Sequence, residues 1–130
     1  MVYVQRMLSF QRLATLSSIV CFELAATWAV TPWLVPLLWS VDDTVPAAVF
    51  GRQSGALFLG FAIVFWRVRK EPASSTRDAL VYGFVVCCLA LAGLSLYELA
   101  SGHAWFGILS AVVVELFLAF GFLRTVLAER

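Results

Sequence analysis

Four long apolar segments constrain this chain more than any other feature of its sequence. Each approaches or exceeds the ~20 residues that a helix needs to cross ~30 Å of hydrocarbon. We place them at Leu8–Val30, Pro46–Trp66, Ala79–Ala100 and Ala104–Leu123. Since 62% of the residues are hydrophobic, 13% are charged and the mean hydropathy is +0.94, a soluble fold would expose large apolar patches. We therefore expect an all-α polytopic membrane protein, with residues 1–130 forming a single antiparallel bundle of four transmembrane helices.

The basic residues predict one orientation in the membrane. With the N-terminus inside, a single basic residue, Arg52, falls on the outer side, and the others are cytoplasmic: Arg6, Arg12, Arg67, Arg69, Lys70, Arg77, Arg124 and Arg130. The aromatic residues agree, because Trp28, Trp33, Trp39, Tyr97 and Trp105 group at one interface and Tyr3, Trp66 and Tyr82 at the other. We expect both termini in the cytoplasm, in a membrane of the bacterial inner-membrane type.

A signal peptide is the competing interpretation of the first segment, since basic residues precede its apolar run. Glu23 interrupts that run, and no small-x-small cleavage site follows it, so we favour a retained helix.

The connections between the segments differ in character. Thr31–Asp43 is rich in Pro and Trp, which predicts a segment along the outer interface with a short helix starting near Pro36. Arg67–Asp78 is a charged cytoplasmic linker whose Ser74, Ser75 and Thr76 can cap the third helix. Only Ser101–His103 separates the third and fourth segments, and Gly102 suits the end of a helix.

Charged residues at membrane depth are the main candidates for function. An ionised side chain in hydrocarbon costs at least ~2.5 kcal/mol and persists when it is paired, hydrated or used. Glu23 and Arg52 lie about 10 Å below the outer edge and Glu115 about 16 Å below it, at 1.5 Å per residue. We expect a Glu23–Arg52 ion pair, with Glu115 as a second partner in a buried polar cluster.

Small residues surround these charges. Gly107, Ala111, Glu115 and Ala119 recur every four residues, which predicts that Glu115 faces protein. The pairs Gly51/Gly55 and Ala56/Gly60 flank Arg52 and Gln53 and predict close helix packing there. The cluster is either a structural device that fixes packing or a functional site, and the sequence leaves both open.

A set of polar and aromatic residues is predicted at the outer rim. With Gln53, it could line a polar pocket that opens outward: Trp33, Trp39, Tyr97, Glu98 and His103. The alternative is that these residues lie at the membrane interface in contact with water and have no binding role. We expect no cofactor and no metal site, because His103 is the single histidine and Cys21, Cys87 and Cys88 have no ligand spacing. No catalytic motif occurs, so we expect a protein that is not an enzyme.

The layout of four helices, the Pro-Trp outer segment and the run Phe50–Gly60 resemble small bacterial membrane families of DoxX-like type. The resemblance implies a fold, and no activity follows from it. A net charge of +1 without a basic run argues against a nucleic-acid partner.

Two hypotheses follow for function. The protein acts by association in the lipid bilayer, as a homo-oligomer or as an accessory subunit of a membrane complex. Alternatively, it is a small proton-coupled transporter or ligand-binding protein, in which Glu23 and Glu115 take a proton or a small polar or cationic ligand.

Overall fold

The computed structural model describes residues 9–42 and 44–129, and the features predicted at Tyr3, Arg6, Leu8, Asp43 and Arg130 lie outside these ranges. Within them the regular secondary structure is helical, without strands. The elements are α2 (Phe10–Val30), α3 (Leu34–Trp39), α4 (Val45–Val68), α5 (Ser75–Ala100), the 3-10 turn η1 (Phe106–Ile108) and α6 (Leu109–Ala128). Four helical stretches of the described chain, namely α2, α4, α5 and η1 with α6, are long and apolar enough to cross a membrane. This confirms the all-helical class and indicates a membrane protein.

Local capping sets the ends of the helices. The third long helix begins at Ser75 and not at the predicted Ala79, because the Ser74 side chain accepts a hydrogen bond from the Arg77 amide at 3.2 Å. It ends in a Schellman motif, in which the His103 amide donates to the Glu98 carbonyl and Gly102 adopts φ 75°. The last helix runs past the predicted Leu123 to Ala128, since buried Thr125 and Val126 continue its packed face.

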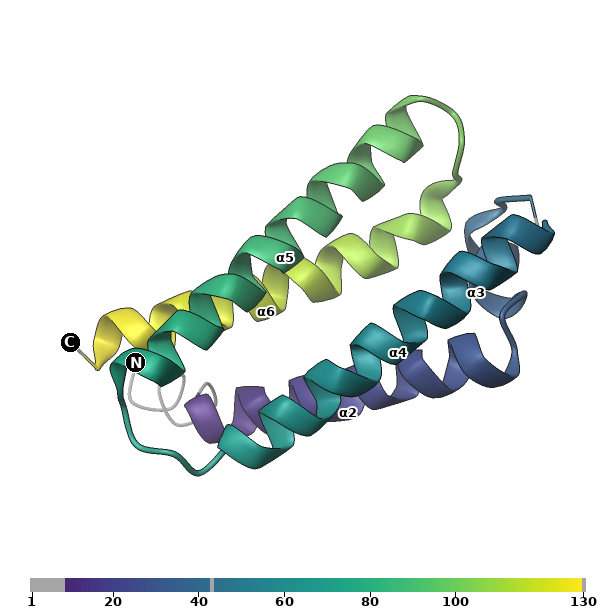
Figure 1. Ribbon diagram of the computed structural model, residues 1–130. Helices are drawn as coiled ribbons and strands as arrows, with labels where there is room; N and C mark the ends of the chain where they lie inside the picture. Colours follow the sequence, from purple (N-terminus) through teal and green to yellow (C-terminus); the bar gives the residue numbers. More distant parts are fainter. Residues whose placement is uncertain (1–8, 43, 130) are drawn as a thin grey trace.

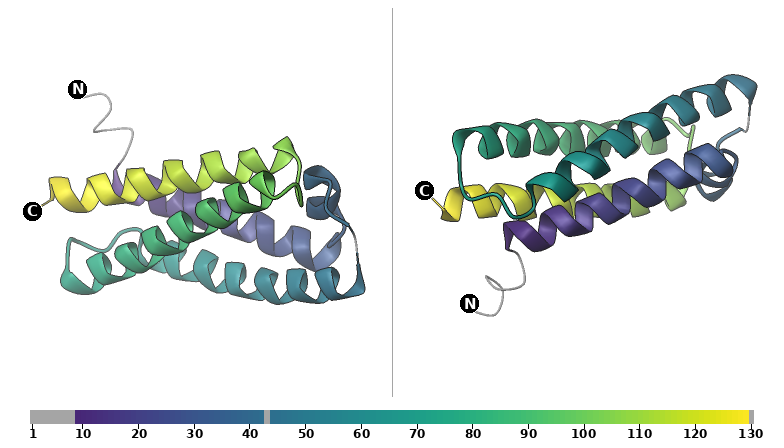
Figure 2. Two further views of the ribbon diagram at one scale, coloured as in Figure 1. Left: turned by 90° about the horizontal axis from the view of Figure 1, so that it is seen from above. Right: turned by 60° about the horizontal axis from the view of Figure 1, so that its bottom comes forward.

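The helices associate in two pairs. In Figures 1 and 2, α2 lies along α4, and α5 lies along α6. The start of α2, the end of α6 and the connection from α4 to α5 lie together at one end of the molecule, and α3 lies at the other. We call these the aromatic end and the α3 end.

An aromatic core joins the two pairs at the aromatic end. Each long helix contributes one ring to it: Phe10, Phe65, Phe84 and Phe122. Their centroids are 4.5 Å apart for Phe65 and Phe84, 5.3 Å for Phe65 and Phe122, and 5.9 Å for Phe10 and Phe122. Phe65 and Phe122 are fully buried. Burial of such rings and their edge contacts stabilise a packed core, so all four helices are held together at this level.

Small residues allow the close approach of α4 to α2. A Cβ at Gly51 would overlap the Trp28 ring, and one at Gly55 would lie 3.0 Å from the Trp28 Cβ. The close packing predicted for Gly51 and Gly55 is therefore present. The second predicted pair does not pack, because Ala56 and Gly60 are exposed and a Cβ at Gly60 would meet nothing within 4 Å.

The short helix α3 packs against η1. The Trp105 amide donates to the Trp39 carbonyl at 2.9 Å, and a Cβ at Gly107 would overlap the Leu38 carbonyl oxygen. The helix starts at Leu34, slightly before the predicted Pro36, since proline is tolerated in a first turn. Gly107 thus serves the approach of α3, and not the long-helix packing that its place in the small-residue stripe predicts.

Candidate functional site

Glu23 lies on the outward face of α2. The face of α2 that meets α4 carries Cys21 and Ala25, which are buried, and Trp28. Glu23 is two residues from both Cys21 and Ala25, so at about 100° per residue it points roughly opposite to them. Its side chain is accordingly exposed.

Arg52 and Gln53 are exposed on α4. Gly51 lies on the face against α2, so Arg52 is rotated from that face by about 100° and Gln53 by about 200°. Within residues 9–42 and 44–129, no ion pair joins Arg52 to Glu23 or to Glu115. The predicted cluster is therefore not formed within one chain, because Glu23 and Arg52 share a depth but lie on different faces of their helices.

Glu115 is the exception among the three, since it lies on the interior face of α6. It is half-buried and shares this face with the buried residues Val112, Ala119 and Phe122. Its Oε2 atom is fully buried and has no hydrogen-bond partner among the described residues. Ser17 on α2 has the same property: its residue is 0% exposed, and its Oγ lacks a partner there. Buried polar atoms are usually hydrogen-bonded, so both atoms require an explanation.

The predicted outer-rim residues lie at the α3 end. Oε2 of Glu98 and Nδ1 of His103 are 2.8 Å apart in a hydrogen bond whose two side chains are exposed. Tyr97 and Trp33 are also exposed, and Trp39 is half-buried. In the described part of the chain, no hydrogen bond links Gln53 to this group, and the polar pocket that opens outward stays a prediction.

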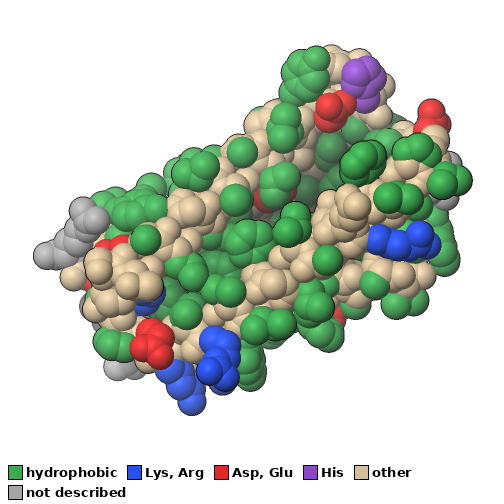
Figure 3. Space-filling view, viewed as in Figure 1, with side chains coloured by type: hydrophobic (Ala, Val, Ile, Leu, Met, Phe, Trp, Pro, Cys, Tyr) green, Lys and Arg blue, Asp and Glu red, His purple; other side chains and the backbone are tan. Residues whose placement is uncertain are grey.

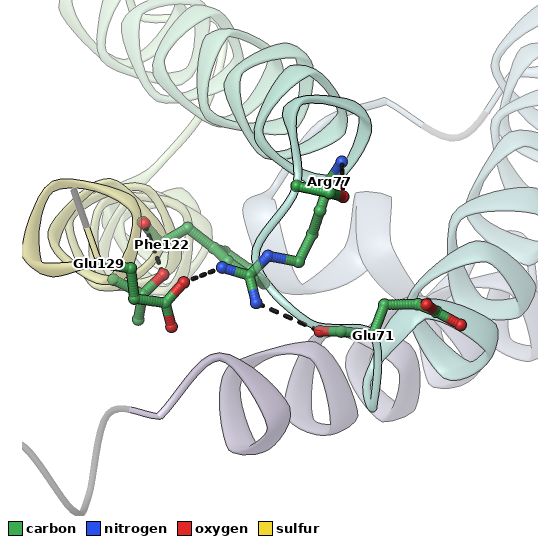
Figure 4. Close-up of polar contacts among 6 residues, drawn as sticks. Glu71, Arg77, Phe122 and Glu129 are labelled. Carbon is green, nitrogen blue, oxygen red and sulfur yellow. Dashed lines mark hydrogen bonds and ion pairs between the residues drawn. The ribbon is translucent and has the colours of Figure 1, made fainter.

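Arg77 is a buried residue with several polar contacts, whereas its place in the sequence predicts only a cytoplasmic charge. It is 6% exposed and ion-paired with Glu129, which follows α6. It also donates to the Glu71 carbonyl at 3.2 Å, and its guanidinium carbon lies 4.3 Å from the centre of the Phe10 ring. Figure 4 shows the guanidinium between Glu129 and Glu71. One side chain therefore ties together the linker and three of the long helices.

A sequence signal for this role of Arg77 did exist. It occupies the third position of α5, and the positive end of the helix dipole disfavours a cation in the first turn. A cation at such a position is compensated elsewhere, which in this protein means Glu129 and the Glu71 carbonyl.

The three cysteines are free, and the described residues contain no candidate metal centre. Cys21 and Cys88 are buried and Cys87 is exposed, all as free thiols. The described residues contain no group of three His, Cys, Asp or Glu side chains placed to hold a metal ion.

Comparison with known protein families, with curated proteins and with solved structures gives no match for this chain. Glu23, Arg52 and Glu115 are therefore the residues whose geometry bears on function.

Proposed function

We propose that the protein is an integral membrane protein that acts by association with copies of itself. The bundle is antiparallel, with the aromatic end and both termini in the cytoplasm of a bacterial inner membrane. The distribution of basic residues supports this orientation, since Arg67, Arg69, Lys70 and Arg77 lie at or beside the connection from α4 to α5.

One observation carries the proposal: Glu23 and Arg52 are exposed at the same depth, and neither is ion-paired with another described residue. Glu23 is seven residues before the end of α2, and Arg52 is seven residues after the start of α4. At 1.5 Å per residue, both lie about 10 Å below the outer edge. An ionised group facing lipid at this depth is costly, and a partner of opposite charge removes most of that cost.

Confinement in a membrane makes such pairing between copies natural. Copies inserted in one orientation hold their Glu23 and Arg52 side chains at one level, so Glu23 of one copy meets Arg52 of another without a shift in depth. Each copy supplies one charge of each sign, and a closed assembly therefore pairs all of them. The exposed apolar surface beside these residues, which includes Ile19 and Val49, adds packing area to the contact.

Charge reversal tests this proposal. We expect the wild-type chain to form oligomers in mild detergent, and Glu23→Arg or Arg52→Glu to weaken association at least about tenfold, since truncating a desolvated charge pair costs about 2–5 kcal/mol. The double variant Glu23→Arg/Arg52→Glu restores the pair with its signs exchanged and should recover the oligomer. The measurement is the mass distribution by light scattering against protein concentration.

The control variant is Glu98→Arg. It changes the net charge by the same amount as Glu23→Arg, but at the α3 end, and should leave the mass of the oligomer unchanged. A wild-type chain that stays monomeric at all concentrations would refute self-association. If none of the charge reversals changes the mass of the oligomer, the role of the Glu23–Arg52 pair is refuted. Wild-type mass that reflects a different co-purifying subunit would favour the accessory-subunit hypothesis.

Ligand binding is a second candidate function, which is favoured by the half-buried position of Glu115 and by the lack of an ion pair with any described residue. Glu23 has no part in it, because its side chain lies on the opposite side of α2 from the bundle interior.

A further inference from the structure

A groove separates the two helix pairs. At the aromatic end, Phe61 and Phe65 of α4 contact Phe84 of α5, with ring centroids 5.6 and 4.5 Å apart. Beyond these rings the pairs diverge toward the α3 end in Figure 1. Figure 3 shows a hollow between α4 and α5 in the same view, with hydrophobic side chains along it and an acidic group at its floor. The groove is thus closed at the aromatic end and open on one side.

Glu115 lies at the level of this groove. It precedes Phe122 of the aromatic core by seven residues on the same face of α6, which places it about 10 Å nearer the α3 end. Phe122 contacts Phe65 of α4 and Phe10 of α2, so the face of α6 that carries Phe122 and Glu115 is turned toward the other pair. It is also only half-buried, which leaves one side of the carboxyl group accessible.

The chemistry of the groove restricts what it can bind. No described basic residue is ion-paired with Glu115, and its buried Oε2 lacks a hydrogen-bond donor. An anion would be repelled by this carboxylate, and a pure hydrocarbon would leave its charge without a counter-ion. A strongly hydrated inorganic cation would lose its water against apolar walls without enough oxygen ligands to replace it. A cation that carries its own apolar surface can pack against the apolar walls and pair its charge with the carboxylate.

We propose that the groove between α4 and α5 binds a lipophilic organic cation, with the Glu115 carboxylate as its counter-ion. The site is separate from the Glu23–Arg52 contact between copies. Contact with the apolar walls of the groove contributes affinity for any apolar ligand, and Glu115 makes the groove selective for positive charge.

Two ions of matched shape test the proposal on the purified full-length chain in detergent. Tetraphenylphosphonium and tetraphenylborate have nearly the same size and apolar surface and opposite charge. We expect saturable calorimetric binding of tetraphenylphosphonium and binding of tetraphenylborate that is at least about tenfold weaker. Equal binding of both ions would overturn the proposal, as would the absence of saturable phosphonium binding, which would leave Glu115 as a packing residue.

Variants of Glu115 locate the site. Glu115→Gln keeps the shape of the side chain and should weaken phosphonium binding at least about tenfold, whereas Glu115→Asp keeps the charge and should retain most of it. Glu71→Gln removes a carboxylate from the exposed linker and should leave binding unchanged. Unaltered affinity in a folded Glu115→Gln variant would overturn the assignment, and so would loss of binding in a folded Glu115→Asp variant. None of these variants alters Glu23 or Arg52, so a negative result here is distinguishable from failure of the association proposal.

Discussion

Gly51 and Gly60 provide a matched pair of substitutions within α4. Both are glycines inside one helix, and both can be changed to alanine without adding charge or polarity. In an α-helix, alanine is favoured over glycine by about 1 kcal/mol, and this gain applies to both sites. The two sites differ in their surroundings: a Cβ at Gly51 overlaps the Trp28 ring, whereas a Cβ at Gly60 meets nothing within 4 Å.

The expected free energies follow from this difference. Overpacking costs about 1–3 kcal/mol, so Gly51→Ala should lower the free energy of unfolding by about 1 kcal/mol once the helix gain is subtracted. Gly60→Ala should raise it by up to about 1 kcal/mol. The difference between the two variants isolates the contact of α4 with α2. The assay is unfolding by sodium dodecyl sulfate in mixed micelles, followed by far-ultraviolet circular dichroism.

A double variant tests whether Trp28 is the cause. In a Trp28→Leu background the ring is absent, so Gly51→Ala should become neutral or stabilising, as Gly60→Ala is in the wild-type chain. If Gly51→Ala stabilises the wild-type protein as much as Gly60→Ala does, the close approach of these two helices is refuted. If Gly51→Ala lowers the free energy of unfolding by the same amount in the Trp28→Leu background, the Trp28 ring is not the cause of the destabilisation.

Three further substitutions test the two ends of the bundle. Arg77→Met should lower the free energy of unfolding in the same assay by about 2–3 kcal/mol, through loss of its hydrogen bonds and of its contact with the Phe10 ring. Glu129→Gln should cost less than about 1 kcal/mol, because the Glu129 side chain is 38% exposed and an exposed ion pair contributes little; equal costs for Arg77→Met and Glu129→Gln would contradict the central role of Arg77. Gly107→Ala should detach α3 from η1, and hydrogen exchange should show the Trp105 amide losing its protection, whereas unchanged protection would mean that the overlap with the Leu38 carbonyl oxygen is avoided without separation.

Hydropathy and capping rules predict much of the fold. Length and apolarity identify the four long helices, since these properties depend only on local sequence. Ser74 and Gly102 mark the two ends of α5 by hydrogen-bonding patterns that are also local. Gly51 and Gly55 indicate a close helix contact, although the spacing alone does not distinguish them from Ala56 and Gly60, which are exposed.

The arrangement of the charges is harder to predict, because the depth of a residue in the membrane does not determine the direction in which its side chain points. Counting residues places Glu23 and Arg52 at one level, but the face that each presents depends on how each helix is rotated against its neighbours. The rotation of α2 is set by residues such as Cys21 and Ala25, and a helical projection of these would have turned Glu23 outward. The role of Arg77 depends on Glu129, which is distant in sequence, so only its unfavourable position at the start of α5 was visible beforehand.

The most direct test of the central claim is cross-linking between copies in the native membrane, with Glu23 and Arg52 left intact. Ile19 and Ala56 are exposed and lie one turn deeper than Glu23 and Arg52 on nearly the same faces. In a background without native cysteines, copies carrying Ile19→Cys should cross-link to copies carrying Ala56→Cys. Copies carrying Ile63→Cys present the same face of α4 about 10 Å deeper and should cross-link poorly. If Ile19→Cys reacts with neither partner, or with both equally, the paired contact between copies does not exist.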